Sequence, residues 1–151
     1  MLVDTSTQTL FLFQEGALVA NFTISSAKNG LGVQEGSECT PRGWHKVAEL
    51  IGHDAPVNSV FKGRVATGEI YSESLAQKFP ERDWILTRII RLSGSEPAFN
   101  DNSFERYIYI HGCPDSEPMG EPLSHGCIRM RNADVACLFS KIIGACSVYI
   151  F

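Results

Sequence analysis

Three side chains able to perform or assist nucleophilic chemistry lie within one short segment. They are His111, His125 and Cys127, and the segment from Tyr109 to Arg131 reads Y-I-H-G-C-P-D-S-E-P-M-G-E-P-L-S-H-G-C-I-R-M-R. A cysteine attacks a carbonyl carbon as its thiolate, and a neighbouring imidazole lowers the thiol pKa from about 8.5 towards neutrality or below. The segment therefore favours acyl transfer through a Cys–His pair.

A glycine beside the cysteine supports the same chemistry. Gly126 lets the backbone approach a substrate closely, because it carries no side chain. Successive main-chain N–H groups at a tight turn can hold a developing oxyanion. The residues alone thus place the chemistry between positions 111 and 127.

The motifs of this segment resemble those of a known family. The S-H-G-C-I-R-M block at 124–130, preceded by a strand ending in I-H-G at 110–112, resembles the L,D-transpeptidase (YkuD-type) catalytic domain. The T-P-R-G turn at 40–43 is similar to the family's T-P-x-G turn, and the opening hairpin is similar to its first strands. The resemblance covers 1–151 as one catalytic domain, and its specificity is concentrated in 111–131.

The resemblance implies a catalytic role for each residue of the motif. Cys127 would be the nucleophile, forming a thioester with the acyl donor. His111 would be the general base, held by the backbone carbonyl of Gly112. His125, together with the N–H groups of Gly126 and Cys127, would line the oxyanion site.

The resemblance also implies a substrate, a peptidoglycan stem tetrapeptide cleaved before its terminal D-alanine, and we expect neither a cofactor nor a metal. Arg129 would stand near the substrate, where a guanidinium can hold a carboxylate bidentately. Ser124 would shape the loop. The loop between His111 and Ser124 is shorter than is usual in the family, and Arg129 stands where many members have asparagine.

Two reactions on peptidoglycan stem peptides or muropeptides are possible, and they differ in the group that attacks the thioester. Water would make the enzyme an L,D-carboxypeptidase of peptidoglycan recycling, whereas the amine of another stem peptide would make it a cross-linking L,D-transpeptidase. The first basic residue is Lys28, and the apolar run at 10–13 is only four residues long, so no secretory signal is predicted. We therefore expect a cytoplasmic carboxypeptidase, with a periplasmic transpeptidase that has lost its export signal as the alternative.

Two H-x-C pairs leave other interpretations open. His111 with Cys113 and His125 with Cys127 offer four soft ligands that could bind zinc tetrahedrally. The chain would then be a non-catalytic zinc-binding or peptidoglycan-binding domain. Cys113 is otherwise a packed bystander or a second thiol that oxidises against Cys127.

Composition excludes several classes of protein. A chain of 151 residues with 44% hydrophobic and 20% charged residues is typical of one globular domain. A formal net charge of −4 without a Lys/Arg-rich run argues against nucleic-acid binding. No apolar stretch approaches the roughly 20 residues of a membrane span. Five cysteines at irregular spacing fit a reducing compartment better than a disulfide framework.

The elements that must position these residues are mostly strands. Runs rich in β-branched and aromatic residues, bounded by turn residues, predict strands at 9–13, 17–24, 44–51, 84–90, 106–110 and 147–151. The stretch 52–66 shows no clear period and is expected to be a loop with short extended pieces. Trp44 and Trp84 are expected in the core. The overall prediction is a mainly β fold, a single-domain sandwich or barrel with one or two helices.

Two helices are predicted. A short one at 72–79 is stopped by Pro80. The stronger one lies near 133–143, with Asn132 as its N-cap and Gly144 after its end. Its apolar residues recur with the period of a helix, at Val135, Leu138, Phe139, Ile142 and Ile143.

Overall fold

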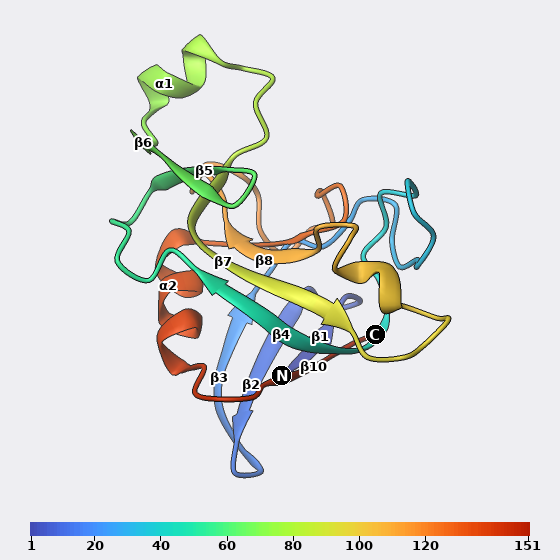
Figure 1. Cartoon of the computed structure of the whole chain (residues 1–151). Helices are drawn as coiled ribbons and strands as arrows, with labels where there is room; N and C mark the ends of the chain where they lie inside the picture. The colour runs from blue at the N-terminus through green and yellow to red at the C-terminus, as the bar shows by residue number, and fades with distance from the viewer.

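The structure, a computed structural model, describes residues 1–151 and is mainly β, as predicted (Figure 1). Ten strands form one mixed sheet: β1 Leu2–Asp4, β2 Thr9–Gln14, β3 Ala17–Thr23, β4 Gly43–Ile51, β5 Ser59–Lys62, β6 Val65–Ile70, β7 Ile85–Gly94, β8 Tyr109–Gly112, β9 Ile128–Met130 and β10 Ser147–Ile150. Two helices, α1 Glu73–Lys78 and α2 Asn132–Lys141, and one 3-10 turn, η1 Asp101–Ser103, complete the chain. Neither helix has the length and apolar character needed to span a membrane.

Strand β7 is the centre of the sheet. The strand order runs β3-β2-β1-β10-β4-β7-β5-β6, and β8 and β9 branch from β7. Both β4 and β8 pair with Ile89, Ile90 and Arg91, so they must lie on opposite edges of β7. The pairs β1–β10 and β8–β9 are parallel, and the other pairs are antiparallel.

Backbone bridges join the segment after β3, at one end of the sheet, to the branch strand β9 and the loop before it. Ser25, just after β3, exchanges two backbone hydrogen bonds of 2.9 Å with Arg129 of β9. A parallel bridge between Ala27 and Ser124 extends the contact. The sheet is thereby curved around its apolar interior, and the segment that carries the cysteine motif is tied to the N-terminal hairpin.

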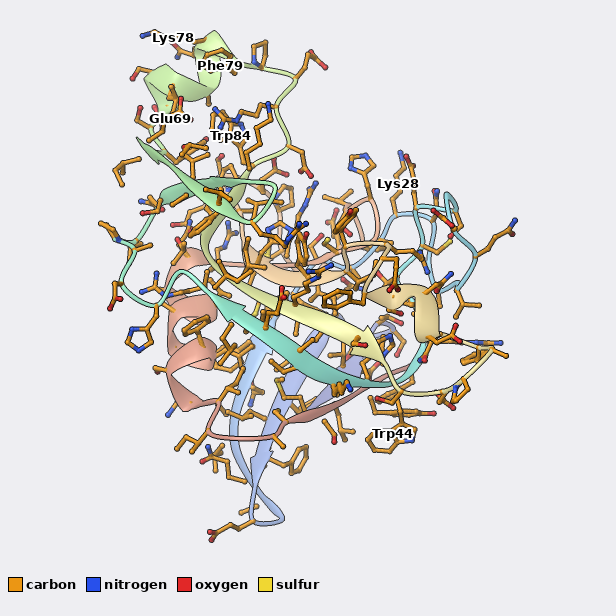
Figure 2. All side chains as sticks on the ribbon, viewed as in Figure 1. Lys28, Trp44, Glu69, Lys78, Phe79 and Trp84 are labelled. Carbon is orange, nitrogen blue, oxygen red and sulfur yellow. The ribbon has the colours of Figure 1, made fainter.

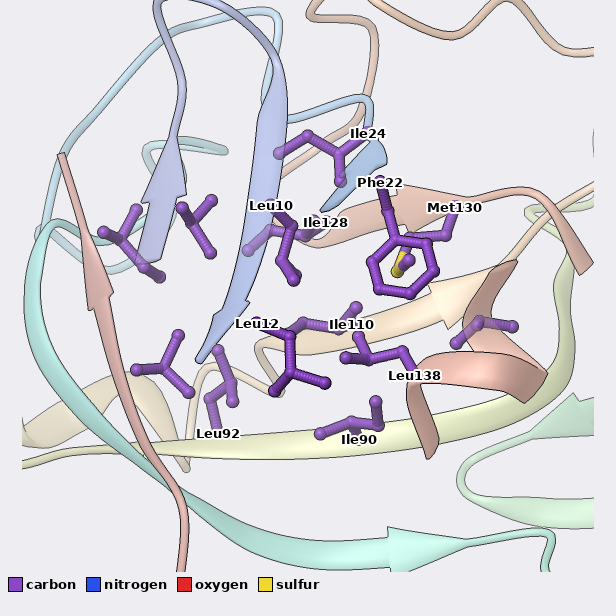
Figure 3. Packing of buried hydrophobic residues seen from close by; sticks show 14 of the residues in the cluster. Leu10, Leu12, Phe22, Ile24, Ile90, Leu92, Ile110, Ile128, Met130 and Leu138 are labelled. Atoms are coloured by element: carbon purple, nitrogen blue, oxygen red, sulfur yellow. The ribbon is translucent and has the colours of Figure 1, made fainter. Parts of the chain in front are cut away.

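The core fills the inside of this curve (Figure 3). Strand alternation directs every second residue inward, and the largest cluster holds 16 buried residues drawn from β1, β2, β3, β7, β8, β9, α2 and β10 and from the segments beside them. Ile110 of β8 and Ile128 of β9 are fully buried in it. Each such aliphatic side chain stabilises the fold by about 1.5–3 kcal/mol, so β8 and β9 are firmly anchored.

Helix α2 lies against β7 and β8 and buries Val135 and Leu138. The predicted helix is confirmed, but two details were wrong. Arg131 rather than Asn132 occupies the N-cap position, because the Asn132 side chain turns inward to a buried polar network. The helix ends at Lys141, and Ile143 is 83% exposed, since the chain turns out into an extended segment before β10.

The shorter helix is confirmed as well. The Ser72 hydroxyl accepts a hydrogen bond of 3.2 Å from the N–H of Leu75, which caps the N-terminus of α1. The helix ends at Lys78, before Pro80, and buries none of its residues. In Figure 1, α1 stands with β5 and β6 at the edge of the molecule, away from the main body of the sheet.

One expectation about the strands is confirmed and one was wrong. The stretch 52–66 is mainly loop with short extended pieces, as expected: the extended pieces are β5 and the start of β6, joined by a tight turn at Gly63 and Arg64, which both have positive φ. The strand expected at 106–110 begins only at Tyr109, because Tyr107 takes a left-handed φ of 57°.

The two tryptophans have different environments. Trp84 is buried, as expected. Trp44 is 48% exposed, because it lies on the outward face of β4 (Figure 2) and packs there against Tyr149, with 4.8 Å between the ring centroids. The expectation that Trp44 belongs to the core was wrong.

Candidate active site

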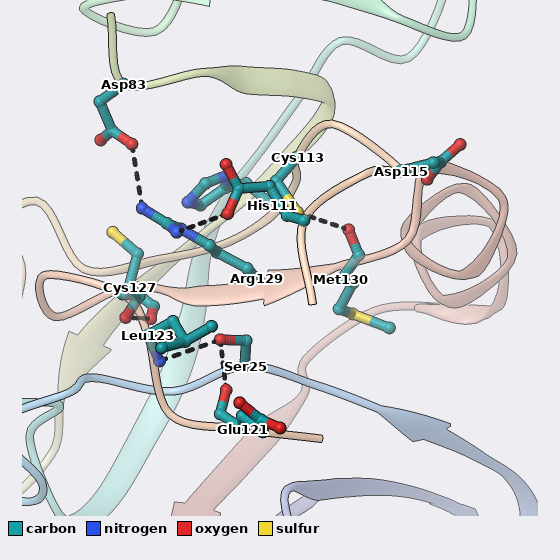
Figure 4. Close-up of polar contacts among 12 residues, drawn as sticks. Ser25, Asp83, His111, Cys113, Asp115, Glu121, Leu123, Cys127, Arg129 and Met130 are labelled. Carbon is teal, nitrogen blue, oxygen red and sulfur yellow. Dashed lines mark hydrogen bonds and ion pairs between the residues drawn. The ribbon is translucent and has the colours of Figure 1, made fainter. Parts of the chain in front are cut away.

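The paired strands β8 and β9 bring the predicted residues to one face. Their parallel register sets His111 opposite Arg129 and Ile110 opposite Ile128. Because side chains alternate along a strand, the isoleucines enter the core while His111 and Arg129 project the other way. Cys127 immediately precedes β9 and lies two residues from Arg129, so it shares this outer face (Figure 4).

The thiol of Cys127 is held by backbone groups of the segment leading into β8. Its Sγ accepts a hydrogen bond from the N–H of Tyr109 at 3.4 Å, and the thiol donates to the carbonyl of Tyr107, also at 3.4 Å. Cys127 packs against the small apolar cluster of Phe61, Ile89 and Tyr109. Burial raises the pKa of Cys127 to about 12, which the Tyr109 N–H offsets only in part. The resting group is therefore a neutral thiol, contrary to the expectation that an imidazole lowers its pKa.

His111 is buried, with 1% of its surface exposed. Its Nδ1 lies 2.8 Å from the carbonyl oxygen of Gly112. A carbonyl can only accept a hydrogen bond, so Nδ1 carries the hydrogen and Nε2 is the basic nitrogen. Burial lowers the pKa of His111 below its usual value, and the Gly112 carbonyl opposes this only in part. The side chain is thus a neutral imidazole whose tautomer suits a general base.

Gly112 is placed where only a glycine fits. A Cβ at this position would lie 2.6 Å from Oδ1 of Asn132 and 2.7 Å from the carbonyl oxygen of Leu86. The Asn132 amide donates to the carbonyl of Cys113 at 2.8 Å, and the Thr87 hydroxyl donates to Oδ1 of Asn132. This buried network fixes the backbone whose carbonyl orients His111. The sequence contains no signal for this network, because Thr87 and Asn132 lie far apart in the chain.

The loop before Cys127 is fixed by two hydroxyl groups. Ser124 donates to the carbonyl of Cys127 and accepts from the N–H of Gly126 at 3.3 Å. Thr40 donates to the carbonyl of Gly126 at 2.9 Å, which docks the T-P-R-G turn onto the loop. The N–H of Cys127 has no hydrogen-bond partner. The loop therefore presents a free donor beside the thiol.

His125 lies on the rim of a hollow of about 270 Å³ beside these strands. The side chain is exposed and forms no hydrogen bond with the rest of the chain. Most residues that line the hollow are charged or polar: Glu81, Arg82, Asp83, Glu117, His125 and Arg129 among them. The hollow is suited to a polar substrate group or to water.

Arg129 is already paired with acidic residues. Its guanidinium lies 3.2 Å from a carboxylate oxygen of Asp83 and 3.6 Å from one of Glu117, and its side chain is only 11% exposed. Figure 4 shows the contact with Asp83, which follows α1. The sequence places Arg129 near the substrate but contains no signal for Asp83, 46 positions away.

Cys113 lies at the wrong end of β8 to react with Cys127. Extending the parallel register, in which Gly112 pairs with Met130, separates the two cysteines by about four residues, or roughly 13 Å. A disulfide requires Cα atoms within about 7 Å, so the hypothesis of mutual oxidation was wrong. Cys113 is buried with its thiol towards the carbonyl of Met130, and burial raises its pKa to about 12. It is a packed bystander.

The structure does not support the zinc interpretation. No group of three or more histidine, cysteine, aspartate or glutamate side chains is arranged to hold a metal ion. The two H-x-C pairs do not converge, because Cys113 and Cys127 lie at opposite ends of the strand pair. All five cysteines are free thiols.

Comparison with known proteins places this geometry in context. The chain matches the family model of the L,D-transpeptidase catalytic domain over residues 1–150. No curated protein matches it by sequence. Among solved structures it is similar to an L,D-transpeptidase from Xylanimonas cellulosilytica, with 20% identity and a TM-score of 0.61 over 99% of this chain and 58% of that one.

Two mycobacterial structures share the fold. An L,D-transpeptidase from Mycobacterium smegmatis is 15% identical, with a TM-score of 0.58 over 99% of this chain and 57% of that chain. L,D-transpeptidase 3 from Mycobacterium tuberculosis, solved with a faropenem-derived adduct, is 16% identical, with a TM-score of 0.60 over 99% and 58%. The chain thus spans somewhat more than half the length of these three structures.

Proposed function

The chain belongs to the L,D-transpeptidase catalytic domain family, and on that basis we propose that it cleaves peptidoglycan stem tetrapeptides before the terminal D-alanine through an acyl-enzyme on Cys127. The observation that carries the proposal is the common face of Cys127 and His111 on two paired strands, with the His111 tautomer set by the Gly112 carbonyl. A base and a nucleophile placed in this way suit acyl transfer.

The first half-reaction starts from neutral partners. Burial keeps the Cys127 thiol protonated and His111 unprotonated. As Sγ attacks the carbonyl carbon, Nε2 of His111 takes the thiol proton. No hydrogen bond joins the two groups in the resting structure, and catalytic hydrogen bonds commonly tighten only when substrate binds.

The oxyanion formed by this attack needs hydrogen-bond donors. The free N–H of Cys127 is such a donor, and each one is worth on the order of 3 kcal/mol to the transition state. The imidazolium of His111 then protonates the amine of the departing D-alanine as the C–N bond breaks. A thioester on Cys127 and a neutral His111 remain.

We propose that water resolves the thioester, which makes the enzyme an L,D-carboxypeptidase that releases a tripeptide. The hollow of about 270 Å³ supports this reaction, because its polar lining suits water and includes Arg129, which lies two residues from Cys127. His111 would again act as the base, taking a proton from the attacking water.

A second candidate is transpeptidation, in which the amine of another stem peptide resolves the thioester. A larger hollow of about 750 Å³ shares the segment from Pro80 to Asp83 with the smaller one and is lined in part by Phe61 and Ile85. It has room for an acceptor peptide. A cross-linking activity would require the enzyme to meet the cell wall outside the cytoplasm, whereas hydrolysis fits soluble muropeptides inside it.

Mass spectrometry of the protein incubated with a disaccharide-tetrapeptide tests the proposal. We expect the tripeptide product with the unmodified protein and with Cys137→Ala, which removes an exposed thiol on α2, and none with Cys127→Ala. A cross-linked dimer or an exchanged D-amino acid would establish transpeptidation instead. Intact tetrapeptide in every sample would contradict both reactions.

A further inference from the structure

Three arginine side chains surround the Cys127 site, and they differ in what they bind. Arg129 is neutralised by two carboxylates. Arg106 donates from both terminal nitrogens to the carbonyls of Gly32 and Cys39, at 3.2 and 2.8 Å, and so fastens the loop between them. The third is Arg64, in the turn between β5 and β6.

Arg64 lies over the two tyrosines whose backbone holds the thiol. Its Nη1 donates to the hydroxyl of Tyr109 at 3.1 Å, and its guanidinium carbon lies 4.9 Å from the ring centroid of Tyr107. The Tyr109 N–H and the Tyr107 carbonyl are the groups that contact Cys127. Arg64 has a left-handed φ of 69° in the tight turn, and its side chain reaches Tyr109 of β8.

The charge of Arg64 has no partner within the chain. None of the five ion pairs includes it. Glu49, the acidic group that acts on it electrostatically, is paired with Arg91 at 3.0 Å. A guanidinium has five N–H donors, and Arg64 uses one of them on a neutral phenol. The others are free, on a chain with a net charge of −4.

We propose that Arg64 binds the terminal carboxylate of the stem tetrapeptide and makes the enzyme selective for a free C-terminal residue. This inference rests on the proposed function and names the group that recognises the substrate there. The scissile bond precedes the last residue, so the carboxylate lies about one residue, roughly 3.8 Å, beyond the attacked carbonyl. Arginine pairs with carboxylates bidentately, and the contacts with Tyr107 and Tyr109 orient its planar group in advance.

The role differs from the one that the sequence suggests for Arg129. A substrate carboxylate would have to displace Asp83 and Glu117 to reach that guanidinium. At Arg64 it would displace no protein carboxylate. The hairpin of β5 and β6, rather than β9, would therefore set the requirement for a free C-terminus.

Calorimetric binding in the Cys127→Ala background tests this role without turnover. The ligands are the disaccharide-tetrapeptide and its C-terminal amide, which differ only in the terminal charge. We expect the protein with Arg64 to bind the acid at least tenfold more tightly than the amide. Arg64→Gln should reduce that ratio to near one, and Arg64→Lys should give an intermediate ratio, because it keeps the charge without the planar fork.

The matched control is Lys62→Gln, which removes a positive charge from an exposed position of the same hairpin. It should keep the full preference for the acid. A tenfold preference that survives Arg64→Gln would overturn the inference, as would equal binding of acid and amide, or no binding of the acid, by the protein with Arg64. An unchanged Tm would show that Arg64→Gln remains folded.

Turnover separates this inference from the proposed function. If binding depends on Arg64 but the protein with Cys127 does not cleave the tetrapeptide, the proposed reaction is contradicted and the carboxylate site is still supported. If the rate of cleavage is unchanged by Arg64→Gln and by amidation of the substrate, the carboxylate site is contradicted and the proposed reaction is supported.

Discussion

The strand pair β8–β9 and the hairpin β5–β6 both reach Cys127, but they are supported very differently. The inner face of β8 and β9 belongs to the cluster of 16 buried residues, whereas the hairpin and α1 rest against two clusters of three. No residue of β6 or α1 is buried. Segments with few buried contacts open locally at low free energy. The reacting groups therefore sit on the rigid region, and the proposed recognition group sits on the looser one.

This difference in packing matches the different requirements of catalysis and of substrate recognition. Proton transfer between His111 and Cys127 requires positions held to a fraction of an ångström, which a packed core provides. A group that admits and releases a peptide benefits from an element that can move. Four measurements test this difference between the two regions.

The largest effect is expected from removing the nucleophile on the rigid face. Cys127→Ala should lower the rate of tetrapeptide cleavage by roughly 10⁴-fold or more, as loss of a covalent nucleophile does elsewhere. The Tm should change little, because the thiol makes only weak hydrogen bonds. Product formation followed by mass spectrometry measures the rate. Residual activity within tenfold of the unmodified enzyme would mean that the reaction does not use this cysteine.

Two glycine substitutions compare the regions directly. Gly112→Ala forces a Cβ against Asn132 and the backbone of Leu86 and should cost about 1–3 kcal/mol of unfolding free energy. Gly68→Ala in β6 meets no atom within 4 Å, so it should cost only the backbone strain of an alanine at a φ of +84°, about 1–2 kcal/mol. Urea denaturation measures both, and equal costs would remove the contrast.

The pH dependence should follow two buried histidines, His111 of β8 and His45 of β4. Burial lowers the folded-state pKa of His111 and of His45, while in the unfolded chain an imidazole titrates near 6.5. Their neutral forms therefore contribute stability that is complete above about pH 6.5 and is lost as the pH falls below it.

The rate of cleavage should share this acid limb. Because neutral His111 is the base, activity should persist somewhat below pH 6.5 and then fall as the imidazole protonates in the folded enzyme. Rate measurements and denaturation at matched pH values check both statements. An acid limb centred above pH 6.5 would contradict the lowered pKa of His111.

The smallest global effect is expected in the looser region. Ser72→Ala removes the hydroxyl that caps α1, which should cost the helix about 1 kcal/mol. Since α1 buries none of its residues, amide hydrogen exchange should speed up in α1 and β6 and stay unchanged in β8 and β9. A comparable change in both regions would show that they unfold as one unit.

The local features of this protein can be predicted from its sequence. Alternation and turn residues predicted most strands, the 3.6-residue period of Val135, Leu138 and Phe139 predicted α2, and the Cys127 motif indicated both the family and the chemistry. These signals are short-range, because backbone preferences and side-chain period depend on neighbouring residues. For the same reason the ends of the helix and of β8 were missed, since packing decides them.

The surroundings of the reacting groups depend on contacts between distant segments of the chain. In the folded chain Asp83 forms an ion pair with Arg129. The side chains of Thr87 and Asn132 are hydrogen-bonded, as are those of Arg64 and Tyr109. The tertiary structure also reverses the expected pKa shift of Cys127, because burial outweighs the local hydrogen bonds. Desolvation and ion pairing depend on which distant segments meet, and no local pattern in the chain encodes that meeting.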